Sequence, residues 1–162
     1  MRVTCHSFRA EPLGKAYIEL IDACCRVAAT FGLIVRESSL ALPEGLSRQL
    51  ERNRPYQSEV LSVQQWPGTV LLGSERALLY RYNVAPGSAA FLASAIDHLF
   101  GWVHPQLPED LCFFRADGSV LLTTTSHERD GYLTLTHEER RIFVGYPTFT
   151  ENTNQEEEFD SN

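Results

Sequence analysis

The triplet Ser126-His127-Glu128 combines a hydroxyl, an imidazole and a carboxylate, the three groups used by serine hydrolases. Neighbouring strand residues point to opposite faces, so the triplet cannot act as one triad, and the chain contains no G-x-S-x-G motif. His127 alone could act as a general base, with Glu128 or Glu109 as its acidic partner. The alternative, which the sequence favours, is that Ser126 ends a strand and that His127 and Glu128 lie in solvent.

Metal and cofactor sites are not indicated. The ligand-type residues His127, His137, Cys112 and Cys5 do not have the spacing of C-x₂-C or H-E-x-x-H zinc sites. The glycines are isolated, so no glycine-rich phosphate loop is present. We therefore expect neither a metal ion nor a cofactor.

The charge of the chain is concentrated at its C-terminus. The formal net charge is -7, of which residues 151–162 contribute -5 because they contain five acidic residues and no Lys or Arg. This division predicts a single domain over 1–150 and a disordered acidic tail over 151–162. The charge argues against direct nucleic-acid binding and suits a basic protein partner, which would meet Glu156, Glu157 and Glu158 in the tail.

The cellular compartment follows from three absences in the sequence. The first residues, MRVTCHSFRAEP, lack the apolar run of a signal peptide, and no apolar stretch approaches the about 20 residues of a membrane span. The four cysteines form no C-x-x-C pair and are interpreted as free thiols. These features predict a cytoplasmic protein without a membrane span.

The periodicity of apolar residues predicts an α+β fold. Apolar residues, Cys24 among them, recur at three- and four-residue steps from Glu11 to Phe31, which predicts a long helix ended by Gly32. Thr136 and Glu139 fit a capping box and predict a last helix. Other helices are expected over 43–52 and 88–100, and strands over 33–35, 58–65, 69–72, 77–84, 111–115 and 119–125. We expect two long helices and shorter helices on one face of an antiparallel sheet of about five strands.

Four aromatic residues allow two interpretations. Tyr80, Tyr82 and Phe114 fall on expected strands, and Trp102 follows the expected second helix. The favoured interpretation places them in the core. The functional alternative is an exposed aromatic patch that binds a partner, because aromatic residues dominate interface hot spots.

In size, acidic charge and expected compartment, the chain resembles the bacterial immunity proteins that neutralise toxins of contact-dependent and type VI competition systems. The resemblance implies a non-catalytic protein that binds a cognate toxin, often a basic one, and blocks its active site. Two alternatives remain: a small hydrolase or transferase using His127, and a scaffold subunit of a larger complex.

Overall fold

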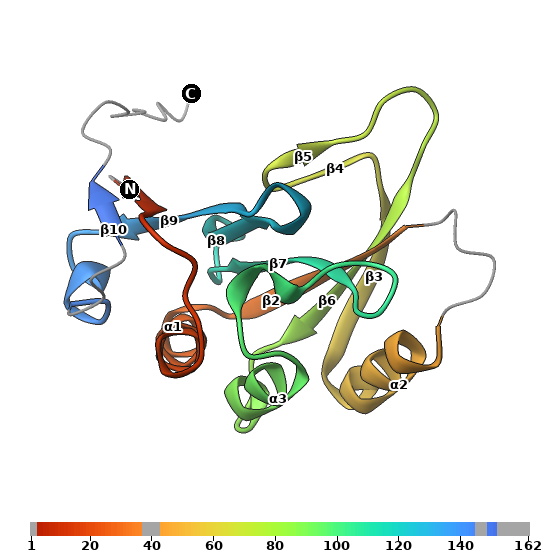
Figure 1. Ribbon diagram of the computed structural model, residues 1–162, viewed down its shortest axis with the longest axis horizontal. Helices are drawn as coiled ribbons and strands as arrows, with labels where there is room; N and C mark the ends of the chain where they lie inside the picture. The colour runs from red at the N-terminus through yellow and green to blue at the C-terminus, as the bar shows by residue number, and fades with distance from the viewer. Residues whose placement is uncertain (1–2, 37–42, 145–148, 152–162) are drawn as a thin grey trace.

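The computed structural model describes residues 3–36, 43–144 and 149–151, which form an α+β fold with three α-helices on one face of an antiparallel sheet (Figure 1). The sheet has eight strands in the order β10-β1-β9-β8-β7-β2-β6-β3, and β4 and β5 form a separate two-stranded sheet. The helices are α1 (Lys15–Val27), α2 (Glu44–Asn53) and α3 (Ser88–Ala95). The strands are β1 (Val3–Phe8), β2 (Thr30–Arg36), β3 (Gln57–Val63), β4 (Gln65–Trp66), β5 (Thr69–Val70), β6 (Ala77–Asn83), β7 (Glu109–Phe114), β8 (Val120–Thr125), β9 (Asp130–Thr136) and β10 (Phe149–Glu151). The tail residues Glu156, Glu157 and Glu158 lie outside the described residues.

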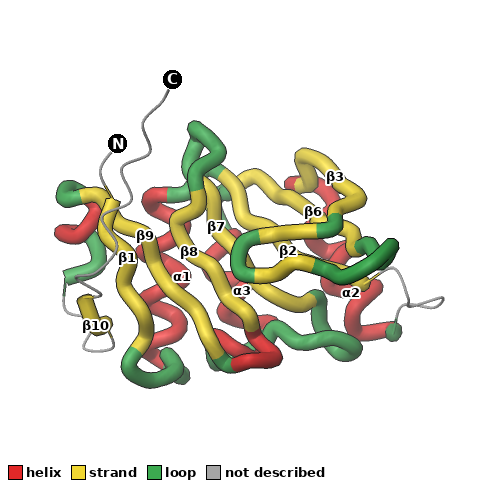
Figure 2. Tube along the Cα trace, turned by 90° about the horizontal axis from the view of Figure 1, so that it is seen from above, coloured by secondary structure: helices red, strands yellow, loops and turns green. Residues whose placement is uncertain are grey.

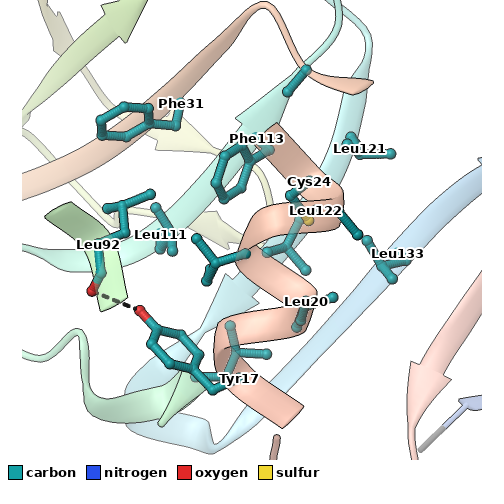
Figure 3. Close-up of a cluster of buried hydrophobic side chains, with 14 of the residues drawn as sticks. Tyr17, Leu20, Cys24, Phe31, Leu92, Leu111, Phe113, Leu121, Leu122 and Leu133 are labelled. Carbon is teal, nitrogen blue, oxygen red and sulfur yellow. Dashed lines mark hydrogen bonds between the residues drawn. The ribbon is translucent and has the colours of Figure 1, made fainter. Parts of the chain in front are cut away.

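The core lies between α1, α3 and the middle strands of the sheet (Figure 3). Burying each large apolar side chain there contributes about 1.5–3 kcal/mol. The Tyr17 hydroxyl is paired inside this layer: it donates to the Leu92 carbonyl at 3.2 Å and accepts from Trp102 Nε1 at 3.0 Å. Cys24 is fully buried, which confirms its predicted core position. The apolar stripe of α1 therefore serves packing, as its spacing indicated.

The first helix is shorter than predicted. It was expected over Glu11–Phe31, but α1 ends at Val27 and Phe31 already belongs to β2, where it packs against Tyr82 at 5.1 Å between ring centroids. Phe31 continued the three- and four-residue spacing of the helix stripe, but it enters the core from a strand. The spacing therefore overestimated the length of the helix. Gly32 is a strand residue, and its missing side chain leaves room for Phe114. It does not end the helix.

Two other helices are also shorter than expected. The helix over 88–100 ends at Ala95, and a single 3₁₀ turn follows at Leu99–Gly101. The capping box is present, since Glu139 N donates to Thr136 Oγ1 at 3.2 Å and Thr136 N donates to Glu139 Oε2 at 2.8 Å. Only the 3₁₀ turn Glu139–Arg141 follows it. The local capping signal was correct, but it does not encode helix length.

The sheet is larger than the expected five strands because three strands were missed. Strands β1, β9 and β10 form one side of the sheet, next to β8 (Figure 2). In β9 the buried Leu133 and Leu135 alternate with half-buried residues, a period-two signal that the sequence interpretation overlooked. The hairpin of β7 and β8 around Asp117 and Gly118 is as predicted, with Arg115 N donating to Ser119 O at 2.8 Å.

Gly131 offers a test of the close packing of β9. A Cβ atom there would lie 2.8 Å from the Thr123 carbonyl oxygen and 3.2 Å from the Phe100 ring. We expect Gly131→Ala to lower the free energy of unfolding by about 1–3 kcal/mol, because backbone atoms cannot move away cheaply. Gly45→Ala is the matched control: its nearest neighbour is Gln106 O at 3.5 Å, and a gain of up to about 1 kcal/mol is expected in helix α2. Urea unfolding followed by circular dichroism measures both, and equal stabilities would contradict this packing.

Candidate functional site

The face of the sheet opposite the helices carries a projecting segment, residues 64–76, which we call the arm (Figure 1). It contains the β4–β5 hairpin, closed by backbone hydrogen bonds that include Leu71 N to Gln64 O at 2.8 Å. Trp66 anchors the arm: its ring is buried against Ile34, Ala77 and Leu79 of the sheet. The arm is therefore seated on the sheet by an apolar contact of its own, separate from the main core.

A buried carboxylate holds the same tryptophan. Trp66 Nε1 donates to Asp110 Oδ2 at 2.8 Å, and Ser126 N donates to Asp110 Oδ1 at 2.8 Å. Asp110 is fully buried and has a φ of 56°, a left-handed conformation that Asp tolerates better than most residues. Burial raises the pKa of Asp110 above its ordinary value, and the Ser126 and Trp66 donors offset part of that rise. Asp110 thus joins the arm to the turn that carries His127.

Arg36 covers the other side of Trp66. Its guanidinium carbon lies 5.1 Å from the centroid of the tryptophan ring, a cation–π distance. The same guanidinium forms an ion pair with Glu109, whose side chain is 9% exposed. Glu109 therefore neutralises a cation beside the arm, and its carboxylate is already occupied. This leaves Glu109 poorly placed as the acidic partner of His127, a role that the catalytic alternative gives to Glu128 or Glu109.

The turn of the arm lies directly over strand β8. A Cβ atom on Gly68 would be 2.7 Å from Thr125 Oγ1 and 2.9 Å from Thr123 Cγ2, and Gly68 has a φ of 84°. Only glycine combines that backbone conformation with so close an approach. Thr125 Oγ1 also lies 3.5 Å from the Gly68 carbonyl oxygen. The arm is thus held at its base by Trp66 and at its turn by β8.

The far end of the arm is apolar and exposed. Val70 is 70% exposed and Leu72 is 84% exposed. The strand expected over 69–72 was interpreted as a buried apolar run, and that prediction is wrong, because the hairpin is too short to bury both of its faces. Beside it is an open hollow of about 390 Å³. Its lining combines arm residues, among them Glu75, with charged and titratable side chains from other segments: Arg36, His127 and Glu128.

His127 and Glu128 line the hollow beside the arm, and both side chains are exposed. His127 Nε2 lies 3.6 Å from Glu128 Oε1, and the two side chains are 46% and 66% exposed. Ser126 is buried, and its Oγ lies 3.4 Å from Thr124 Oγ1. Within the described part of the chain, no serine or cysteine is hydrogen-bonded to the His127 ring. The triplet is a 3₁₀ turn, as the favoured interpretation of a polar turn expects.

The aromatic residues proposed as a partner-binding patch are mostly core residues. Tyr82 and Trp102 are fully buried and Phe114 is 5% exposed, while Tyr80 is half-buried. An exposed patch of these four aromatics is therefore wrong. Tyr82 and Phe114 lie on β6 and β7, which are inner strands of the sheet, and Tyr82 and Trp102 both belong to the main core. Phe114, for example, lies under the Arg81 guanidinium at 4.7 Å.

The residues that define the arm were not identified from the sequence. Trp66 and Asp110 are far apart along the chain, and no local pattern marks their contact. One usable signal was the spacing in QWPGTV, where a Pro-Gly turn separates two very short extended segments. Such a hairpin projects and leaves side chains such as Val70 in solvent. Arg36 gives no sequence signal, because its role depends on pairing with Glu109.

Comparisons with known proteins leave the site to be interpreted on its geometry. No protein-family model, curated protein or solved structure matches this chain. Among the described residues, no helix has both the length and the apolar composition to cross a bilayer. The same residues contain no group of three or more His, Cys, Asp or Glu side chains arranged to hold a metal ion.

The Trp66–Asp110 contact predicts a pH-dependent stability. A carboxyl group whose pKa is higher in the folded than in the unfolded state stabilises the fold at low pH, and that contribution is lost as the pH rises through the folded pKa. Trp66→Phe removes a donor that lowers the pKa of Asp110, so the loss of stability should grow as the pH rises. We expect Trp66→Phe to lower the free energy of unfolding by about 1–3 kcal/mol near neutral pH and by less near about pH 4.

Trp102→Phe is the matched control for this measurement. Trp102 Nε1 donates to the Tyr17 hydroxyl at 3.0 Å, and burial raises the pKa of Tyr17, so that hydroxyl is neutral throughout the range. The loss in free energy of unfolding caused by Trp102→Phe, measured by urea unfolding, should therefore be the same at both pH values. Equal pH dependence of the two variants would contradict an ionised Asp110 beneath the arm.

Proposed function

We propose that this protein is a non-catalytic protein-binding module that docks its partner on the arm. The observation that carries the proposal is the exposed apolar end of the arm, where Val70 and Leu72 are 70% and 84% exposed. Large apolar side chains held in solvent on a fixed support are the usual anchors of protein interfaces. Trp66 and Asp110 provide that support through their 2.8 Å hydrogen bond.

The charge of the chain favours a basic partner. The net charge is -7, and the hollow beside the arm exposes the carboxylates Glu75 and Glu128. Complementary charge would speed encounter with a basic protein, while tightness would come from Val70 and Leu72. This combination supports a more specific proposal, that the protein is an immunity protein whose partner is a basic bacterial toxin domain. The acidic tail would add to the attraction at long range.

The open geometry of the hollow supports binding over catalysis. A small hydrolase or transferase using His127 remains the second proposal, since His127 Nε2 lies 3.6 Å from Glu128 Oε1. General bases act most strongly where water is excluded and the base is oriented by a third group. Here both side chains face solvent, and Glu109 is engaged by Arg36. The binding proposal does not use His127.

The test is binding to a purified partner. The full-length chain is used to capture partners from its source cells, and each candidate is then purified and titrated by calorimetry. We expect a basic partner bound at one-to-one stoichiometry, with affinity that falls as salt rises. The double variant Val70→Asp/Leu72→Asp should weaken binding at least tenfold, because it replaces both anchors with charges.

Two controls separate the arm from general effects. Leu13→Asp changes a residue that is 59% exposed near the start of α1, and it should leave the affinity unchanged. A chain ending at Glu151, which keeps β10 intact, should retain most of the affinity at high salt but bind less tightly at low salt. Unaltered binding by the double variant would refute docking on the arm, whatever the partner. Loss of the partner's toxic activity in the complex is the outcome that the immunity proposal requires.

A further inference from the structure

Strand β3 forms one edge of the eight-stranded sheet and pairs, among the described residues, with β6 alone. It runs from Gln57 to Val63, and its side chains are exposed or half-buried throughout. An edge strand carries a row of backbone N–H and C=O groups that point away from the sheet and can pair with another strand. The chain runs from this edge directly into the arm, but the proposed partner binding does not use β3.

Both faces of β3 expose apolar side chains. Val60 is 39% exposed opposite Tyr80, and Leu61 is 38% exposed opposite Leu79. Because adjacent strand residues point to opposite faces, a further strand added at this edge would cover both of them at once. An added strand would therefore bury apolar surface above and below the sheet while satisfying the backbone groups between.

Two features that can protect an edge strand lie near the ends of β3. A register shift lies between Gln57 and Glu59, and Arg76 Nη2 donates to the Ser62 carbonyl oxygen at 2.7 Å. Native edges are commonly blocked by lysine, proline or an inward-pointing charge. The strand QSEVLSV contains no lysine or proline. Its one charge, Glu59, is neutralised by Arg81 Nη1 at 2.8 Å.

We propose that β3 pairs antiparallel with β3 of a second copy of this chain, around a two-fold axis at Val60. In this register Val60 faces Val60 of the second copy, Ser58 faces Ser62, and Glu59 faces Leu61. No like charges are directly opposite, and small polar residues meet each other, which is the self-complementarity that a two-fold interface requires. The two sheets join into one continuous antiparallel sheet.

The local charge of β3 favours the second copy over a basic partner at this edge. With Glu59 neutralised by Arg81, β3 offers no net charge to steer a basic protein. Two copies of a chain of net charge -7 repel each other at long range, so their pairing must tighten as salt screens that repulsion. Partner binding on the arm has the opposite salt dependence, so the two interactions can be separated.

The expected dimer is weak. A seven-residue strand pair is smaller than a standard protein interface of about 1,600 Å². We therefore expect a dissociation constant on the order of micromolar or weaker, at least several-fold tighter in about 500 mM salt than in about 50 mM salt.

Sedimentation equilibrium of the full-length chain, over a concentration series at both salt levels, measures this association. Val60→Lys and Leu61→Lys each place a charge at the edge and should weaken the dimer at least tenfold, with the fold checked by circular dichroism. Leu13→Lys is the matched control, since Leu13 is 59% exposed elsewhere on the molecule, and it should dimerise like the wild type. A wild-type chain that stays monomeric at several hundred micromolar overturns the proposal. A dimer that persists in the folded lysine variants also overturns it.

A cross-linking experiment tests the register and does not depend on the lysine variants folding. Val60→Cys places thiols on the two-fold axis, where paired strand residues have Cα atoms about 4.5–5.5 Å apart, within disulfide range. Mild oxidation should link two copies through the introduced thiol, identified by peptide mapping to separate it from the native cysteines. Leu13→Cys should give no such link. Failure of Val60→Cys to cross-link under conditions in which the chain dimerises would refute pairing around Val60.

Discussion

The structure on the open face of the sheet depends on one buried carboxylate, that of Asp110. It accepts hydrogen bonds from Trp66 of the arm and from Ser126 of the turn after β8, both at 2.8 Å, while its own backbone N–H donates to Trp102 O at 3.2 Å. Three segments distant in sequence are thus held by one residue. A buried carboxylate must find such donors, since leaving it unpaired is costly. This requirement fixes the arm to the sheet.

Fixing the arm makes its exposed end useful for recognition. A mobile loop would lose conformational entropy on binding a partner, whereas a preorganised one does not. Trp66 is held by an apolar pocket, by Asp110 and by the stacked Arg36 guanidinium, so Val70 and Leu72 project from a rigid base. The two faces of the sheet therefore differ. The helix-covered face holds the main core, and the opposite face carries the exposed apolar end of the arm, which is the docking surface proposed above.

The sequence predicted the features that depend on local patterns. The stripe of α1, the β7–β8 hairpin around Asp117-Gly118 and the α+β class are seen in the structure, since each is encoded within a few adjacent residues. The missed features depend on distant pairings. Strands β1 and β9 support each other across nearly the whole chain, and Asp110 looked like a turn residue because its partners Trp66 and Ser126 are not its sequence neighbours. The triplet at His127 was correctly favoured as a turn, but its position beside the arm could not be deduced.

The pairing of β1 with β9 constrains when the molecule can fold. Val3 pairs with Thr136, so β1 cannot take its place in the sheet until β9 has been made. Helix α1, which is local, can form during that wait, whereas this side of the sheet closes only after β9 is present. Half of the residues of β1 are apolar, since VTCHSF contains Val3, Cys5 and Phe8, and all three are half-buried in the final structure. Until β9 is made, β1 is therefore an unpaired strand with apolar side chains, a kind of segment that can pair wrongly with other chains.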